Sequence, residues 1–451
     1  MQSLDASRKL ETRVATMPTS DSRLTTENWK AQPSIFRIAF ASFIGTAIEF
    51  YDFYIYGLAV AMVIGPVFFP ESNPAAQSLN AFLTFGIAFL ARPFGALLFG
   101  HFGDRAGRKT TLVASLLVMG TSTMLIGVLP GYEMAGWAAP ALLCLLRFAQ
   151  GIGLGGEWGG AALLAAEYAP AGRRGWYGMF PQLGPPVGFL FAVGSFLLLS
   201  NLLSDAEFRA WGWRIPFLAS TVLVVIGLYV RLKLAETPVF AKAIQSHQQV
   251  RLPLSELFAH HAKPLILGAL TMVVCYALFY IATVFSLSYG VAMLHIPRPQ
   301  FLGMLCIAII FMAAATPLAA WAGDRYGRRP VLLAAGIAAL FSGFLMEPLL
   351  GSGSPALITL FLSLELFLMG ATFAPMGALL PELFPTAVRY TGAGAAYNLG
   401  GILGASLAPY LAQQLVQYGG LAWVGGYISV AAAISVTAAV LLRETRDKDL
   451  T

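Results

Sequence analysis

The chain has 451 residues, of which 57% are hydrophobic and only 11% are charged, and its formal net charge is +6. A soluble domain carries about 25% charged residues, so this composition excludes an ordinary soluble fold. The apolar residues form long, near-continuous runs, which predict membrane-spanning helices rather than the alternating strands of a barrel. The three cysteines, Cys144, Cys275 and Cys306, lie inside such runs and predict no disulfide framework.

The predicted elements begin after a polar segment, residues 1–34, which has no apolar stretch typical of a signal peptide and predicts a cytoplasmic N-terminal tail. Twelve spans follow, and their predicted ranges are 35–66, 79–102, 110–129, 137–165, 178–200, 212–231, 264–290, 300–322, 330–350, 355–380, 391–416 and 421–442. They divide into an N-terminal six-helix bundle (35–231) and a C-terminal six-helix bundle (264–442). A central cytoplasmic loop (232–263) joins the bundles, and a cytoplasmic tail (443–451) ends the chain.

Lysine and arginine are distributed very unevenly between the connections. The two tails and the even-numbered connections hold 22 of them, whereas the odd-numbered connections hold only Arg209 and Arg298. Because basic residues favour cytoplasmic loops, the distribution predicts a multi-pass protein with both termini in the cytoplasm. The basic residues lie between the spans and form no separate patch, so they indicate no nucleic-acid partner.

Three short segments occur twice. The loop GHFGDRAGRK, from Gly100 to Lys109, recurs 220 residues later as AWAGDRYGRR, from Ala320 to Arg329. The second pair is EYAP at 167–170 and ELFP at 382–385, and the third is Glu-Thr at 236–237 and 444–445. The repeats predict two similar halves in the same orientation, a plan typical of secondary transporters with a site near the bilayer midplane.

The paired loops resemble the signature of the major facilitator superfamily, although Ala320 replaces the first glycine in the second copy. Other segments resemble its metabolite:proton symporter branch, which carries shikimate, 2-oxoglutarate, citrate and proline or betaine. These segments are 49–57, 92–95, 155–160, 211–216 and 236–240. The resemblance implies the major facilitator fold: an all-α integral membrane protein with twelve transmembrane helices in two pseudo-symmetric six-helix halves.

The resemblance also implies a protein of the bacterial inner membrane that works as a monomer. It implies transport of a small-molecule substrate with protons, driven by the proton gradient and without a cofactor. The sequence contains no metal-ligand spacing, nucleotide-binding glycine loop or hydrolase triad, so we expect neither catalytic residues nor a metal site.

Charged residues inside the spans are the first candidates for function, because an ionisable group in the bilayer is costly. The proton-coupling candidates are Glu49, Asp52, Arg92, Arg147 and Glu157. Glu49 and Asp52 are three residues apart and share one helix face, so we expect one of them to hold a proton. We expect Arg92 to pair with Asp52 or Glu49. At least one of the pair is expected to act in proton or substrate binding, and a static structural ion pair is the alternative.

A second set is predicted to bind the substrate. Either arginine could meet a substrate carboxylate, and Tyr276, Phe279 and Tyr280 share a face that could line a cavity or contact lipid. Glu365 could line the cavity or be structural. The full set is Tyr51, Arg92, Arg147, Gln182, Tyr276, Tyr280, Glu365, Tyr397 and Asn398. Along span four, Gly151, Gly155 and Gly159 follow the small-x-x-x-small spacing of closely packed helices.

The repeated loops are predicted to form a cytoplasmic gate. Glycine permits a tight turn, aspartate can cap a helix N-terminus, and arginine can bridge to carboxylates on neighbouring helices. The resemblance implies a latch that holds the cytoplasmic side closed, whereas simple membrane anchoring is the alternative. The gate candidates are Gly100, Asp104, Arg105, Gly107, Arg108, Glu167 and Arg173 in the first half and Asp324, Arg325, Arg328, Glu382 and Arg389 in the second.

These observations favour proton symport, by alternating access, of a small organic acid such as a shikimate-like, di- or tricarboxylate metabolite. Two alternatives stay open. The deep charges comprise four acids and two bases, so a zwitterionic osmolyte such as proline or betaine would also fit. Proton/drug antiport is the other, but its span-five glycine signature matches only partly because Phe189 replaces the last glycine.

Overall fold

The structure is a computed structural model that describes all residues except 1–34, 107, 156–168, 171, 234–252 and 448–451. The chain separates into two units, Met1–Ile38 and Ala39–Thr451, and every feature considered below lies in the second. In the described residues the secondary structure is helical and contains no strand.

The first half supplies six long helices, most of them close to the predicted ranges. They are α3 (Ile35–Ala59), α5 (Pro74–Ala106), α6 (Arg108–Val128), α8 (Ala138–Gly155), α10 (Arg174–Leu202) and α12 (Ile215–Lys233). The helix α3 continues through a π-helical turn, η2 (Val60–Ile64), into α4 (Gly65–Phe68). Two short helices, α7 (Tyr132–Ala135) and α11 (Asp205–Ala210), lie in connections.

The second half repeats this plan. Its long helices are α15 (Ala262–Tyr280), α17 (Arg298–Tyr326), α18 (Arg328–Ser342), α20 (Pro355–Phe373), α22 (Arg389–Gly401) and α24 (Leu421–Leu441). Several spans continue through breaks, as α15 does through η4 (Ile281–Phe285) into α16 (Ser286–Ala292). The other continuations are η5 (Gly343–Leu345) with α19 (Met346–Leu350), α21 (Met376–Leu383), and η7 (Ile402–Ser406) with α23 (Ala408–Gly419). A short helix, α14 (Pro253–His260), precedes α15 and a 3₁₀ turn, η6 (Thr386–Val388), precedes α22.

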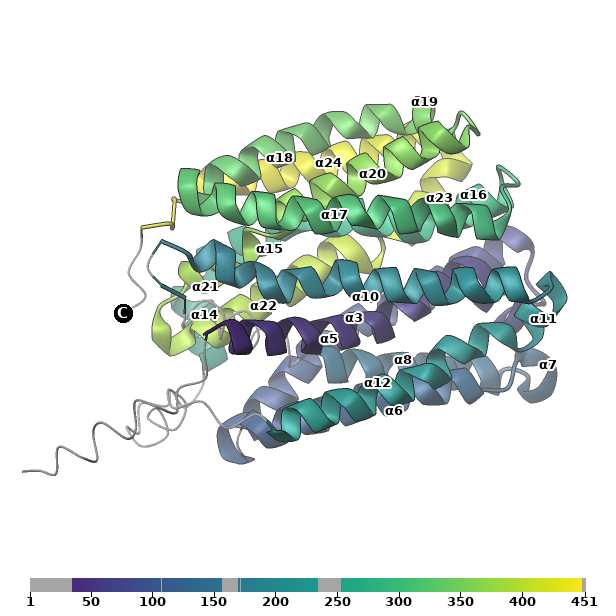
Figure 1. Ribbon diagram of the computed structural model, residues 1–451, viewed down its shortest axis with the longest axis horizontal. Helices are drawn as coiled ribbons and strands as arrows, with labels where there is room; N and C mark the ends of the chain where they lie inside the picture. Colours follow the sequence, from purple (N-terminus) through teal and green to yellow (C-terminus); the bar gives the residue numbers. More distant parts are fainter. Residues whose placement is uncertain (1–34, 107, 156–168, 171, 234–252, 448–451) are drawn as a thin grey trace, which may run out of the picture. The chain divides into compact units, whose positions relative to one another are not determined.

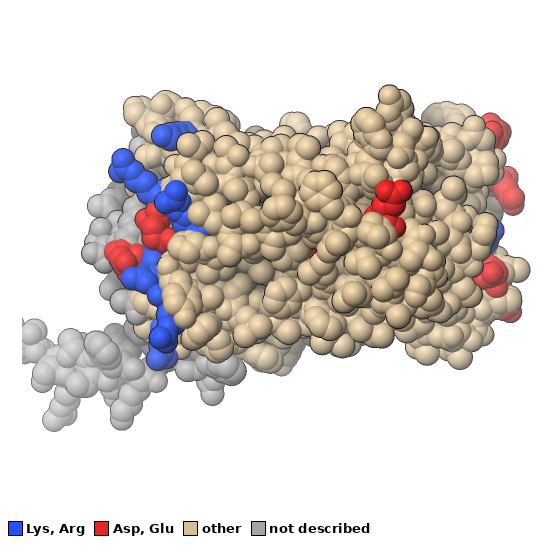
Figure 2. Space-filling model, turned by 90° about the horizontal axis from the view of Figure 1, so that it is seen from above, with Lys and Arg blue, Asp and Glu red and all other residues tan. Residues whose placement is uncertain are grey.

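Ten helices in the described part of the chain are long and apolar enough to cross a membrane. The remaining two predicted spans correspond to α6, whose apolar core is the shorter segment Val113–Val128, and to α22 with α23, which η7 interrupts. Figure 2 shows Lys and Arg gathered mainly at one end of the visible face and Asp and Glu mainly at the other, with a broad uncharged band between them.

We call these the basic end and the acidic end. The basic end carries Arg174, Arg325, Arg328, Arg329 and Arg443, and the acidic end carries the exposed acids Glu71, Glu133, Asp205, Glu207 and Glu347.

Helices α10 and α5 of the first half join it to the second. Helix α10 packs along α17, and the two lie side by side in Figure 1; it also contacts α21. Helix α5 packs against α22, η7 and α23. These contacts form the seam between the halves.

Within the first half, glycines bring α5 and α8 into backbone contact. A Cβ atom on Gly151 would lie 2.2 Å from the Ala88 carbonyl oxygen, and one on Gly155 would lie 2.0 Å from the Arg92 carbonyl oxygen. The spacing in span four therefore has the packing role predicted for it, at least at these two positions. The close approach fixes the helix that carries Arg92 against the helix that carries Arg147.

We predict that Gly151→Ala lowers the melting temperature of the purified protein, because the added methyl group must push α5 and α8 apart. Such overpacking costs about 1–3 kcal/mol. The matched control is Gly303→Ala in α17, where a Cβ atom would meet nothing within 4 Å. A Gly151→Ala protein that melts with the control would show that the contact is not tight.

Candidate functional site

Four charged residues predicted for the site lie buried in the first half. Arg147 and Asp52 are fully buried, and Arg92 and Glu49 are at most 5% exposed. They come from α3, α5 and α8: α5 packs along α8, and Gln150 of α8 donates a hydrogen bond to the Asp52 carbonyl oxygen of α3. The fifth proton-coupling candidate, Glu157, lies outside the described residues.

Arg147 is held by groups of its own half. It donates hydrogen bonds to the Gln150 side-chain oxygen and to the Phe85 carbonyl oxygen, and its guanidinium carbon lies 3.8 Å from the centre of the Tyr56 ring. Gln150 in turn donates to the Thr123 hydroxyl and to the Asp52 backbone carbonyl. This network ties together α3, α5, α6 and α8, so in this conformation Arg147 acts as a structural connector.

Arg92 differs from Arg147 in what surrounds its guanidinium. Its guanidinium carbon lies 4.2 Å from the centre of the Phe89 ring and 4.7 Å from that of Phe53. Its Nε and Nη2 atoms have no hydrogen-bond partner in the described structure. The ion pair with Asp52 or Glu49 stays a prediction.

Aromatic rings from both halves surround Arg92 and close the seam at mid-depth. Tyr54 stacks on Phe279 with ring centres 4.8 Å apart, and Phe85 meets Tyr280 edge to face at 5.1 Å. We call this group the aromatic centre; its members are Phe53, Tyr54, Phe85, Phe89, Phe189, Tyr276, Phe279, Tyr280 and Tyr397.

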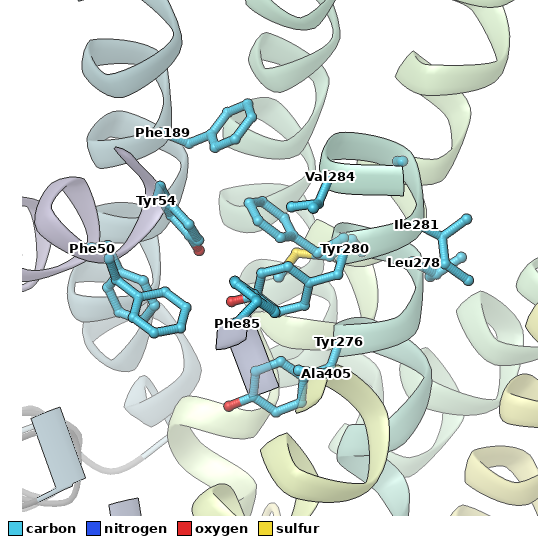
Figure 3. Packing of buried hydrophobic residues seen from close by; sticks show 14 of the residues in the cluster. Phe50, Tyr54, Phe85, Phe189, Tyr276, Leu278, Tyr280, Ile281, Val284 and Ala405 are labelled. Atoms are coloured by element: carbon cyan, nitrogen blue, oxygen red, sulfur yellow. The ribbon is translucent and has the colours of Figure 1, made fainter. Parts of the chain in front are cut away.

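Two tyrosines of the second half point their hydroxyl groups toward the first half. Figure 3 shows the hydroxyl ends of Tyr276 and Tyr280 pointing to the side of the helix that carries Tyr54. The Arg92 charge acts electrostatically on Tyr54, Tyr276, Tyr280 and Tyr397. The structure therefore brings three predicted substrate residues, Tyr276, Tyr280 and Tyr397, together with Arg92.

The other predicted substrate residues lie elsewhere. Gln182 donates to the Phe373 carbonyl oxygen at 2.9 Å and Asn398 to that of Gly155 at 3.4 Å, so both make contacts between the halves. Tyr51 donates to the Pro216 carbonyl oxygen inside the first half. Glu365 is fully buried beside the Ser342 hydroxyl of α18.

At the basic end, Asp324 joins the halves as a helix cap. Its two carboxylate oxygens accept hydrogen bonds from the backbone N–H groups of Gly175 and Trp176, both at 2.8 Å, in the first turn of α10. Arg328 donates to Asp324 at 2.8 Å and to Glu382 at 3.2 Å. Three predicted gate residues of the second half therefore meet.

The remaining gate candidates with described side chains are Arg389, Arg325 and Arg173. Arg389 donates to the Phe384 carbonyl oxygen, Arg325 lies beside the Trp321 and Tyr326 rings, and Arg173 is exposed. The Glu167 position and the side chains of the first loop lie outside the described part of the chain; that loop's candidates are Gly100, Asp104, Arg105, Gly107 and Arg108. The latch therefore stays a prediction there.

Glu444, whose site role the sequence did not reveal, completes the basic end. Its carboxylate accepts from the backbone N–H groups of Arg328, Arg329, Thr445 and Arg446, at 2.9–3.0 Å. Partial burial alone would raise the pKa of Glu444, but these four donors together hold that pKa below its ordinary value. The repeated Glu-Thr pair was the signal that could have indicated this cap.

At the acidic end a single arginine joins the halves. Arg298, at the start of α17, donates from Nε to the Ser200 hydroxyl at 2.9 Å and from Nη2 to Asp205 at 2.8 Å. Its guanidinium carbon lies 3.7 Å from the centre of the buried Phe208 ring. We call this contact the Arg298 clamp. The halves are thus in contact at both ends and at the aromatic centre, so the conformation is closed on both sides there.

Known protein families match both halves of the chain. The family described as "Sugar (and other) transporter" matches residues 38–257, and the Major Facilitator Superfamily matches residues 294–451. A proton:xylose symporter, XylE, bound to 6-bromo-6-deoxy-D-glucose has a similar fold, with a TM-score of 0.71 at 17% identity over 92% of this chain and 97% of that one.

Curated relatives cover almost the whole chain. The inner membrane metabolite transport protein YhjE of Escherichia coli K12 is 53% identical over 92% of this chain and 95% of its own length. The shikimate transporter of the same strain is 37% identical over 91% of this chain and 95% of its own length. Its proline/betaine transporter is 33% identical over 91% of this chain and 84% of its own length.

We predict that Glu444→Ala lowers the free energy of unfolding at neutral pH by about 1 kcal/mol, the usual value of a helix cap. The pKa of Glu444 is lower in the folded state, so its stabilisation is present above the unfolded pKa of about 4.3 and is lost as the pH falls through the folded value. Melting curves should therefore separate at pH 7 and converge in acid. Glu133→Ala, at an exposed acid of the other end, is the control; a gap that persists in acid would contradict this account.

We predict that Arg298→Ala opens the acidic end. A charge-assisted hydrogen bond contributes about 1.5–3 kcal/mol, so its loss should speed labelling of a cysteine placed at the buried Ser288 about tenfold. Labelling is followed with a membrane-impermeant thiol reagent in a chain without its three native cysteines. Arg209→Ala, an exposed arginine of the same end, serves as the control. Equal labelling rates in the two variants would refute the clamp.

Proposed function

Because the chain belongs to the major facilitator superfamily, we propose that it carries a small organic anion across the inner membrane together with a proton. The protein is a membrane-embedded metabolite transporter and not an enzyme. The identity of the substrate and the coupling to protons are the parts we propose. We infer that one copy suffices for transport, since each chain contains both halves and the seam between them.

The observation that carries the proposal is that the Nε and Nη2 atoms of the buried Arg92 have no hydrogen-bond partner in the described structure. A guanidinium with two unpartnered nitrogens, enclosed by rings, is costly to keep in the bilayer. A substrate carboxylate would supply the missing acceptors and could bind two nitrogens at once. The position between the halves also fits, because alternating access requires a site that both halves contact.

The nearby acids support coupling to a proton. Glu49 and Asp52 lie three residues apart on α3 and are almost completely buried. Two negative charges so close together in the bilayer repel each other, and protonation of one removes the repulsion. Binding of an anion near Arg92 would add a further negative charge and would favour proton uptake. Substrate binding would thus promote proton binding, as symport requires.

The two ends of the seam would open in turn. We propose that the basic end faces the cytoplasm, because basic residues favour that side. Opening there requires release of the Asp324 cap from α10, and opening on the other side requires release of the Arg298 clamp. A substrate bound at the aromatic centre would be enclosed between them.

A zwitterionic osmolyte is the second candidate. Aromatic faces attract quaternary ammonium groups, and the aromatic centre offers many such faces beside a cation that could hold the carboxylate. The relative named as a proline/betaine transporter agrees with this alternative. We favour the organic anion because the nitrogens without a hydrogen-bond partner in the described structure belong to the cation Arg92.

The proposal predicts that carboxylates stabilise the purified protein against heat and do so more strongly at about pH 5.5 than at about pH 7.5. Arg92→Lys should weaken this binding about 10–100-fold, because lysine lacks the planar fork that binds two oxygens. Arg209→Lys, an exposed acidic-end variant, should bind as the native protein does. Hits confined to betaines would favour the osmolyte, and vesicle uptake that ignores the proton gradient would refute symport.

A further inference from the structure

Glu365 is the acid at the middle of α20, and the proposed function makes no use of it. Its side chain is fully buried, and neither carboxyl oxygen has a hydrogen-bond partner within the described residues. An ionised carboxylate in such a place would be extremely costly, because it has lost its water and gained no counter-charge. We therefore expect the Glu365 carboxyl to be protonated and neutral.

The surroundings of Glu365 contain no compensating charge. The helices packed against α20 include α15, α17, α18, α19 and α21, and their charged side chains lie toward the two ends of the bundle. Titratable residues nearer its depth are Cys275, Tyr276, Tyr280 and Cys306. None of these groups interacts electrostatically with the Glu365 carboxyl. Its polar neighbour is the Ser342 hydroxyl of α18.

The Ser342 hydroxyl does not supply the donor that an ionised Glu365 would need. It donates its single proton to the Ala339 carbonyl oxygen at 2.9 Å. Neither carboxyl oxygen of Glu365 has a hydrogen-bond partner within the described residues. Because a buried carboxylate without donors or a counter-charge is very costly, the geometry favours Glu365 in its protonated form while the bundle is closed.

Ser342 also marks a joint in its helix. Helix α18 ends at Ser342, a 3₁₀ turn covers Gly343–Leu345, and α19 follows. A Cβ atom on Gly343 would lie 2.3 Å from the Gly425 carbonyl oxygen, so the joint packs backbone to backbone on α24. A 3₁₀ stretch inside a helix often marks a hinge. The acid therefore lies beside a part of span nine where the backbone changes its winding.

We propose that Glu365 is a second proton-binding site of the transport cycle, located in the second half and separate from the set around Arg92. In the closed bundle the carboxyl holds its proton. When the α18–η5 joint opens and admits water, the O–H bond breaks, the proton passes to water and the carboxylate is hydrated. It must take up a proton again before the bundle closes. This inference rests on the proposed proton coupling and extends it to the other half.

The first test reads the protonation state directly. Infrared spectra of the protein in lipid vesicles at neutral pH should contain the carbonyl stretching band of a protonated carboxyl, and Glu365→Gln should remove one carboxyl's share of it. Glu347→Gln, at an exposed acid of α19, should leave the band unchanged. A band that is as strong in Glu365→Gln as in the native protein would overturn the inference whatever the transport activity.

The second test separates coupling from a purely structural role. Glutamine has the shape of the neutral acid but cannot release a proton, so Glu365→Gln should keep substrate exchange across the vesicle membrane. It should lose proton-driven accumulation about tenfold or more. A variant that accumulates substrate with the native pH dependence would overturn this inference alone. A native protein that accumulates substrate without a proton gradient would refute the proposed function, and the coupling role of Glu365 with it.

Discussion

The placement of one positive charge, that of Arg92, constrains the rest of the site. A guanidinium can remain in the bilayer only if its environment stabilises it, and the Phe53 and Phe89 faces do so incompletely. The backbone contacts of Gly151 and Gly155 hold α5 rigidly against α8, so the cation cannot withdraw toward water. Tyrosines of the second half pack on the other side of the aromatic centre. Two guanidinium nitrogens of Arg92 thus remain without a hydrogen-bond partner in the described structure, and we interpret them as the place where an anionic substrate binds.

The two ends of the seam use different chemistry to close. At the basic end, Asp324 and Glu444 accept from backbone N–H groups at helix N-termini, so folded main chain is itself the binding partner. At the acidic end, the Arg298 clamp depends on side chains, and its partner Asp205 is largely exposed. A bond to main chain breaks only when helices separate, whereas a side-chain pair can be loosened locally. Opening the basic end therefore requires helices to separate, whereas opening the acidic end requires a side-chain pair to break.

The sequence predicted the fold well because membrane spans leave strong signals in apolar length and in the distribution of Arg and Lys. It predicted the central tyrosines and the Asp324–Arg328–Glu382 group through helical spacing and repetition. It could not predict which groups would pair, because pairing depends on how helices distant in the chain are rotated. For that reason the Arg298 clamp and the Glu444 cap were missed.

The Glu444 cap has a consequence for how the protein is made. Helix α18 receives its N-terminal acceptor from a residue that is 115 positions or more further along the chain. During synthesis, all described helices of the second half, which end with α24 at Leu441, precede this acceptor. A nascent carrier whose helices are inserted before Glu444 is translated therefore lacks this closure, and the basic end is completed only afterwards.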